Sequence, residues 1–168
     1  LSKMVKTLLD MSELQTVSRD ETIAVDALVD EVLVDLEPLA QEKEIKLIGN
    51  CKDTTMVGSD ILIYRMVYNL VENAIKYNHF GGQVTVTAYR KGKSICLSVE
   101  DTGSGIPAEL KERIFEPFFR VDKSRSRQLG GVGLGLALVR EIVRVHDGRI
   151  TVQSSPSGGT IFEVVFTQ

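Results

Sequence analysis

Two neighbouring stretches in which polar and apolar residues alternate strictly constrain the fold most. Residues 83–90 (QVTVTAYR) and 94–101 (SICLSVED) alternate with a period of two, and only Lys91-Gly92-Lys93 separates them. A period of two places successive side chains on opposite faces of a strand. The pattern therefore predicts an antiparallel hairpin with one buried face.

Three helices and further strands accompany this hairpin. Apolar periodicity predicts helices over residues 26–43, 59–78 and 133–145, the first two beginning at an Asp or Ser that serves as N-cap. Pro38 lies inside the first helix and is expected to kink it or loosen one turn. Strands are expected over residues 23–25, 45–48, 56–57, 149–154 and 160–167, the last two forming a closing hairpin.

Because these elements do not alternate as β–α–β units, they predict an α+β fold. The expected architecture is a two-layer sandwich, with a mixed, mostly antiparallel sheet and about three helices on one face. A chain of 168 residues suits one compact domain, and its net charge of −3 argues mildly against nucleic-acid binding. No apolar run approaches the ~20 residues of a membrane span, and no signal peptide is expected.

The first residues carry a stripe of apolar side chains at helical spacing: Leu1, Met4, Leu8 and Met11. This stripe fits either a terminal helix packed on its own domain or the end of a longer dimerising helix. Residues 15–22 are polar and indicate a linker. We therefore expect residues 1–18 to be the end of a dimerisation helix with its linker, and 19–168 to be the domain proper.

The second predicted helix has one polar face. At about 100° per residue, Asn69, Asn73 and Lys76 fall within an arc of ~60°, with Glu72 beside them, and apolar residues cover the opposite arc. An asparagine oxygen suits Mg²⁺, and a lysine one turn further can reach a phosphate. The alternative is a merely solvated face.

Asp101 ends the inward-facing parity of its strand, where a carboxylate is costly unless it is hydrogen-bonded. It can either cap a turn amide or accept a bond from the amino group of a ligand such as adenine. Gly103 and Gly105 follow, and they allow the backbone to approach a flat ring closely.

A third block, Gly130–Leu136, precedes the last helix and holds glycines at 131, 133 and 135. Amides of such a loop can face phosphates, although a simple hinge is the alternative. The block does not match the GxxxxGK[ST] phosphate loop. Residues 120–127 supply four cations beside it, which suits a triphosphate. The long stretch 102–132 has no sustained period and is expected to be a functional or mobile loop.

These blocks, in this order, resemble the boxes of the sensor histidine kinase catalytic domain, a member of the GHKL ATPase superfamily. Residues 69–77 resemble its N box, 101–106 its G1 box, 130–136 its G2 box and 158–160 its G3 box. Residues 115–119 (FEPFF) resemble the F box in its ATP lid. The resemblance implies the Bergerat ATP-binding fold with a long mobile lid.

The resemblance also implies a role for each residue on the polar helix face. Asn73 would bind Mg²⁺, and Asn69 would support the phosphates or the metal. Glu72 would help to polarise the attacking group, Lys76 would hold a phosphate, and Tyr77 would stack near the adenine.

Further roles follow from the loops. Asp101 would take the adenine amino group, and Arg120 would approach the γ-phosphate. The remaining nucleotide-binding residues implied by the resemblance are Gly103, Gly105, Ile106, Gly131, Val132, Gly133, Leu134, Gly135 and Thr160.

Two departures from the family pattern matter. Val132 stands where Thr or Ser is usual, so a hydroxyl near the phosphates is lost and weakened ATP binding is expected. The family's acceptor histidine lies on an upstream helix, and neither His79 nor His146 has that context. We expect turn and C-cap roles for these two histidines.

The function implied is binding of Mg·ATP and transfer of the γ-phosphoryl to a histidine on an upstream dimerisation domain, for relay to a response regulator aspartate. The resemblance further implies a homodimer for the whole protein, a monomer for this segment, and the cytoplasmic domain of a membrane-anchored bacterial sensor. The alternatives are an ATP-gated clamp or chaperone, a serine-phosphorylating anti-sigma kinase, and a degenerate nucleotide-binding module.

Overall fold

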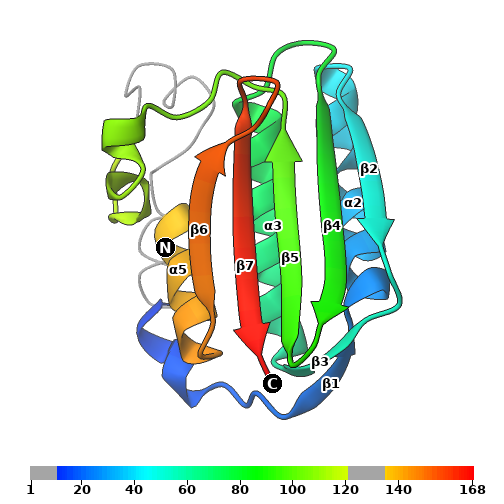
Figure 1. Ribbon diagram of the computed structural model, residues 1–168, viewed down its shortest axis with the longest axis vertical. Coiled ribbons are helices and arrows are strands. Elements are labelled where there is room, and N and C mark those ends of the chain that lie inside the picture. Colours follow the sequence, from blue (N-terminus) through cyan, green and yellow to red (C-terminus); the bar gives the residue numbers. More distant parts are fainter. Residues whose placement is uncertain (1–10, 121–134) are drawn as a thin grey trace.

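The computed structural model describes residues 11–120 and 135–168. Within these ranges one five-stranded sheet carries the helices on one of its faces, and the other face is open (Figure 1). The helices are α2 (Val25–Glu42), α3 (Asp60–Lys76) and α5 (Gly135–Val145). The sheet contains β2 (Lys46–Cys51), β4 (Gln83–Lys91), β5 (Ser94–Asp101), β6 (Arg149–Ser154) and β7 (Thr160–Thr167). The predicted α+β two-layer sandwich is confirmed.

The strand order is β2-β4-β5-β7-β6. The hairpin β4–β5 and the closing hairpin β6–β7 are antiparallel as predicted, and β5 also pairs antiparallel with β7. Only the pairing of β2 with β4 is parallel within this sheet. The sheet is therefore mixed and mostly antiparallel.

The apolar faces of the helices and the inner face of the sheet form a single core. In α3 the buried positions recur at three and four residues, so one side of the helix packs against its neighbours and the other is left for polar side chains. These buried residues are Leu62, Ile63, Met66, Val67, Leu70, Val71, Ala74 and Ile75.

The segment expected to be a polar linker is more ordered than predicted. A short 3-10 helix, η1 (Leu14–Thr16), overlaps its first residues, and the strand expected over residues 23–25 begins inside it as β1 (Glu21–Ala24). Strand β1 pairs with β3 (Thr55–Gly58) as a separate antiparallel ribbon. Leu14, immediately before this segment, is 2% exposed and belongs to the core, so the segment is anchored to the domain at both ends.

Helix α2 differs from expectation at its start and at Pro38. The N-cap of α2 is Ala24 rather than Asp26, because the Val25 amide already donates to the Thr54 carbonyl at 2.9 Å. The helix runs through Pro38 without interruption. Pro38 is exposed, so water can satisfy the carbonyl that proline leaves unpaired. Ser59 caps α3 as predicted, its hydroxyl accepting a bond from the Leu62 amide at 3.3 Å.

Candidate nucleotide-binding site

Helix α3 presents its predicted polar face. Asn69, Glu72, Asn73 and Lys76 are all partly exposed, and Lys76 lies 3.6 Å from the Glu72 carboxylate as an i,i+4 ion pair. The Asn69 amide nitrogen donates to the Arg65 carbonyl at 2.7 Å, which fixes the orientation of its side chain.

The start of α5 lies against this face. A Cβ atom placed on Gly135 would lie 3.3 Å from Oδ1 of Asn69. Gly135, a residue of the glycine-rich block that the structure describes, is therefore a neighbour of the polar face of α3. Gly131, Val132, Gly133 and Leu134 lie outside the described residues, and their predicted contacts with phosphate stay predictions.

Asp101 is buried at the end of β5, with 9% of its surface exposed, as its strand parity predicted. Its Oδ1 accepts hydrogen bonds from the amides of Gly103 at 2.8 Å and Thr160 at 3.3 Å. Burial raises the pKa of the Asp101 carboxyl above its usual range, although these two bonds act in the opposite direction. The side chain thus ties the loop after β5 to the start of β7.

Both readings of Asp101 are compatible with this geometry. The bonds that the described residues make to its carboxylate all go to Oδ1, as a turn cap requires. A second oxygen remains on a carboxylate, and it can accept from the amino group of a base. The Asp101 side chain can therefore both cap the loop after β5 and bind the amino group of a ligand.

The loop after β5 approaches its neighbours so closely that two glycines are required. A Cβ on Gly103 would lie 2.6 Å from the Tyr77 carbonyl oxygen, which no neighbour could accommodate without shifting. Gly105 has a φ of +77°, and a Cβ there would lie 2.6 Å from the Gly158 carbonyl oxygen. The N-box end of α3, the G1 loop and the β6–β7 turn therefore meet at one end of the sheet, the upper end in Figure 1.

Asn78 joins these segments, although the sequence indicated only a turn there. It is 1% exposed, its Oδ1 accepts from the His79 amide at 2.8 Å and the Thr102 hydroxyl at 3.1 Å, and its Nδ2 donates to the Gln83 carbonyl at 3.0 Å. A single sequence does not distinguish a buried asparagine from an exposed one at a helix end, so no local signal marked this role.

The structure describes only some of the residues in the predicted lid. Phe115 is buried and meets Phe162 edge-on, with ring centroids 6.2 Å apart, while the Arg113 guanidinium lies 4.6 Å above the Phe119 ring. Ile106 packs against the core. Arg120 is half-buried at the end of the described range, and its predicted approach to a γ-phosphate stays a prediction.

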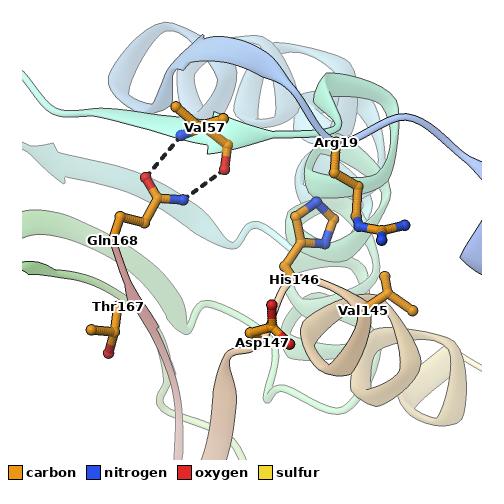
Figure 2. Close-up of a pocket in the computed structure, with 7 residues that line it drawn as sticks. All are labelled: Arg19, Val57, Val145, His146, Asp147, Thr167 and Gln168. Atoms are coloured by element: carbon orange, nitrogen blue, oxygen red, sulfur yellow. Dashed lines mark hydrogen bonds between the residues drawn. The ribbon is translucent and has the colours of Figure 1, made fainter.

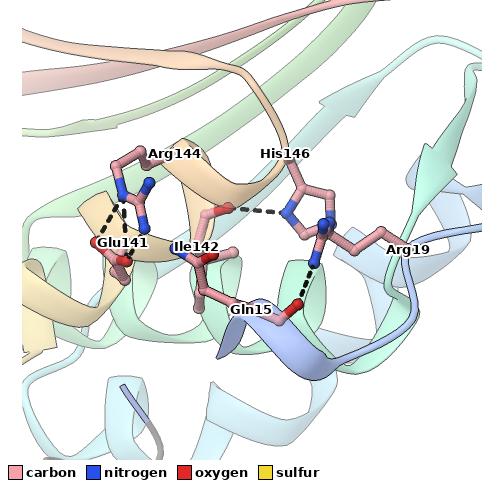
Figure 3. Close-up of polar contacts among 6 residues, drawn as sticks. All are labelled: Gln15, Arg19, Glu141, Ile142, Arg144 and His146. Atoms are coloured by element: carbon pink, nitrogen blue, oxygen red, sulfur yellow. Dashed lines mark hydrogen bonds and ion pairs between the residues drawn. The ribbon is translucent and has the colours of Figure 1, made fainter. Parts of the chain in front are cut away.

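His146 has a structural role at the opposite end of α3. Its Nδ1 lies 2.8 Å from the Ile142 carbonyl and donates to it, while Nε2 accepts from the Ser59 amide at 3.0 Å (Figure 3 shows the first contact). This arrangement needs the neutral ring. Burial lowers the pKa of His146 accordingly. The predicted C-cap role is thus extended to a clamp on the N-terminus of α3.

A hollow of about 340 Å³ lies beside His146 (Figure 2). Its lining residues are Arg19, Val57, Val145, His146, Asp147, Thr167 and Gln168. The Gln168 amide bonds to both backbone groups of Val57 and closes one side. Helix α3 has 17 residues and so is about 25 Å long, and this length separates the hollow from Asp101 and the candidate nucleotide-binding site.

No group of three or more His, Cys, Asp or Glu side chains suited to a metal is found in residues 11–120 and 135–168. Protein ligands alone are therefore not gathered into a metal cage there. Mg²⁺ bound with ATP requires only one or two protein ligands, because phosphate oxygens and waters complete its shell. Asn73 on the polar face of α3 fits that requirement.

Comparison with known proteins defines the class to which this fold and site belong. The family model described as "Histidine kinase-, DNA gyrase B-, and HSP90-like ATPase" matches residues 58–168, and the chain belongs to this family. Membership in this family implies that the chain binds ATP. The sheet with its helices on one face is the Bergerat fold, as its structural neighbours are histidine kinase catalytic domains.

Within that family, the chain is most usefully compared with sensor kinases. It is 39% identical over 166 residues to the sensor-like histidine kinase SenX3 of Mycobacterium tuberculosis, covering 96% of this chain and 40% of SenX3. The adaptive-response sensory kinase SasA of Crocosphaera subtropica is 42% identical over 135 residues, which is 79% of this chain and 35% of SasA. The chain thus spans about two fifths of the length of such relatives.

Solved structures of histidine kinases share this fold. The mycobacterial sensor histidine kinase MprB superposes with a TM-score of 0.78 at 27% identity, covering 88% of this chain and 97% of that one. Histidine kinase ThkA, solved in complex with the response regulator TrrA, gives a TM-score of 0.79 at 26% identity, covering 98% of this chain and 46% of ThkA. None of the helices in the described ranges combines the length and apolar character that a membrane span requires.

Proposed function

We propose that this chain is the catalytic segment of a sensor histidine kinase, which binds Mg·ATP and transfers its γ-phosphoryl to a histidine on an upstream dimerisation domain. The observation that carries the proposal is the meeting of three separate sequence blocks around Asp101. The loop after β5 packs against the Tyr77 carbonyl, and the start of β7 contributes the Thr160 amide to the Asp101 carboxylate.

The adenine side of the site is supported by Asp101. Its carboxylate is buried where the loop after β5 meets the start of β7, and both bonds from these segments go to Oδ1, which leaves the second oxygen to accept from a base. We assign it the exocyclic amino group of adenine, with Tyr77, Ile106 and Thr160 bordering the base.

The phosphate side is supported by the polar face of α3 and the start of α5. We assign Asn73 to Mg²⁺, Asn69 to the phosphates or metal, and Lys76 to a phosphate. The bound metal would neutralise charge on the phosphates. In phosphoryl transfer most of the catalytic effect comes from positioning and charge neutralisation, so few further groups are needed.

We propose that Glu72 assists the histidine that attacks the γ-phosphate. Its ion pair with Lys76 at 3.6 Å keeps a carboxylate beside a cation next to the proposed phosphate position. A carboxylate there can accept the proton of the imidazole as the other ring nitrogen attacks. Arg120 is proposed to add positive charge at the γ-phosphate.

The partners proposed are the upstream domain of the same protein, as a homodimer, and the receiver domain of a response regulator. ThkA in complex with TrrA supports the second partner by similarity. We propose that the whole protein is a membrane-anchored bacterial sensor with this segment on the cytoplasmic side.

An ATP-gated clamp is the second candidate, because the family description also covers DNA gyrase B and HSP90-like ATPases. The relatives named above are sensor kinases, and this favours the kinase.

The test combines this chain with the upstream helical domain of its parent and γ-labelled ATP. We expect label on a histidine of the upstream domain and none on His79 or His146. Steady release of phosphate with no labelled protein would replace the kinase by the clamp, and the absence of Mg-dependent ATP binding in calorimetry would indicate a degenerate module.

A further inference from the structure

Lys43, the residue that follows α2, reaches across to the end of a different helix. Its ammonium donates hydrogen bonds to three backbone carbonyls, those of Ile75 at 3.3 Å, Lys76 at 2.9 Å and Asn78 at 2.7 Å. Two of these belong to the last turn of α3 and the third lies just beyond it. One side chain thus gathers the carbonyls with which α3 ends.

This contact has a clear physical basis. The last carbonyls of a helix have no partner within the helix, and they form the negative end of its dipole. An ammonium group carries three donors and a full positive charge, so three converging carbonyls match it well. Bonds to a charged donor are stronger than those between neutral groups.

The backbone of Lys43 is itself held on both sides. Its amide donates to the Ala40 carbonyl at 3.1 Å, and its carbonyl accepts from the Gly81 amide at 2.8 Å. The nearby Lys46 amide donates to the Gly82 carbonyl at 3.0 Å, where β2 begins beside β4. The backbone from which the Lys43 ammonium extends is therefore fixed, and the ammonium connects the end of α3 to α2 and to the sheet.

The turn that Lys43 holds is the one that carries the proposed phosphate and metal residues Asn73 and Lys76. It is followed by Tyr77, whose carbonyl is the surface against which Gly103 packs. A shift of this turn would change the separation between the α3 residues and Asp101, since the loop leaves no space at Gly103 to absorb it.

We propose that Lys43 is a positioning residue for nucleotide binding: by holding the end of α3 it sets the distance between the groups that bind phosphate and metal and the carboxylate that reads adenine. The proposal rests on the proposed function of the site, since it assumes that one ATP molecule spans both groups.

The test compares ATP and adenosine. Adenosine touches only the adenine side, so its affinity does not depend on the separation of the two sides, whereas ATP must contact both at once. Lys43→Met removes the ammonium and keeps the length of the side chain. Lys46→Met is the matched control, because Lys46 is exposed on β2 three residues away.

Calorimetry with Mg·ATP, and displacement of a fluorescent ATP analogue by adenosine, are performed on the full chain at a temperature where circular dichroism shows each variant folded. We expect Lys43→Met to weaken ATP binding at least about tenfold, or ~1.4 kcal/mol. Adenosine binding should change less than about twofold, Lys46→Met should match wild type, and Lys43→Arg should recover part of the ATP affinity.

Equal losses for ATP and adenosine, or no loss for ATP, would overturn the proposal, because a lysine that only stabilises the fold produces no difference between the two ligands. If Lys43→Met does not fold, Lys43→Gln, which is neutral but keeps a donor, is expected to show the same difference between ligands. Failure of the wild-type chain to bind ATP would instead refute the proposed function, so the two failures are distinguishable.

Discussion

The substitution Asp101→Asn tests the proposed reading of adenine most directly. The two side chains have the same shape, and an asparagine oxygen can still accept from the Gly103 and Thr160 amides as Oδ1 does now. The amide nitrogen would then occupy the position of the second carboxylate oxygen. There it would point a donor at the adenine amino group, which is itself a donor.

The size of the effect follows from the charge of the group that is lost. A hydrogen bond to a charged group contributes about 1.5–3 kcal/mol, which corresponds to roughly a 10- to 150-fold loss of ATP affinity. Guanine presents an oxygen where adenine presents its amino group, so the variant should also lose much of its preference for ATP over GTP.

The fold should tolerate this change. Burial raises the pKa of Asp101 in the folded state, so the charged form is disfavoured there relative to the unfolded chain. The folded state therefore binds more protons between the ordinary carboxyl pKa of about 3.9 and the raised value, and stability falls as pH rises through that window. Asparagine does not titrate, so at neutral pH the variant should melt no lower than wild type.

The assay is isothermal titration with Mg·ATP and Mg·GTP, combined with thermal melting. The matched control is Glu100→Gln, since Glu100 neighbours Asp101 on β5 but is only partly buried. An Asp101→Asn variant that melts like wild type and binds ATP with unchanged affinity would refute the reasoning, because the carboxylate would then act only as a turn cap.

Three further predictions concern metal, backbone space and pH. Asn73→Ala should remove most of the Mg²⁺ dependence of ATP binding, which a metal titration at fixed ATP measures; retained dependence would reassign the ligand. Gly103→Ala should cost about 1–3 kcal/mol in urea unfolding, because the new Cβ would lie 2.6 Å from the Tyr77 carbonyl oxygen. Because the pKa of His146 is lowered in the folded state, its contribution to stability is complete above the ordinary histidine pKa of about 6.5 and is lost as pH falls from there through the lowered value. Urea midpoints from pH 8 to pH 5 should fall for wild type and fall less for His146→Gln; parallel curves would contradict the clamp on Ser59.

The features that sequence analysis predicted well depend on local periodicity. The alternation of β4 and β5 set both the hairpin and the buried position of Asp101, because a period of two leaves little freedom of register once one face is apolar. Ser59 was identified as an N-cap for a similar local reason. The polar face of α3 followed from helix geometry alone.

The features that were missed depend on contacts between distant segments. The N-cap of α2 moved from Asp26 because the Val25 amide finds the Thr54 carbonyl, a partner that no local pattern indicates. A strand was expected over residues 23–25, but β1 begins earlier, at Glu21, where pairing with β3 extends it into a segment of polar composition. Lys43 directly follows α2, and a lysine at the end of a helix commonly has its ammonium in solvent. Here the ammonium bonds to carbonyls of residues more than thirty positions later in the chain.

Both ends of α3 are held by side chains from other elements, and this bears on how the site can work. At the first turn of α3, His146 at the end of α5 accepts a hydrogen bond from the Ser59 amide. At the last turn, the Lys43 ammonium at the end of α2 donates hydrogen bonds to the terminal carbonyls. Bonds at both ends oppose sliding and tilting of α3, which favours a defined geometry for Asn69, Asn73 and Lys76, the residues proposed to bind phosphate and metal. Preorganised groups of this kind do not spend binding energy on their own rearrangement.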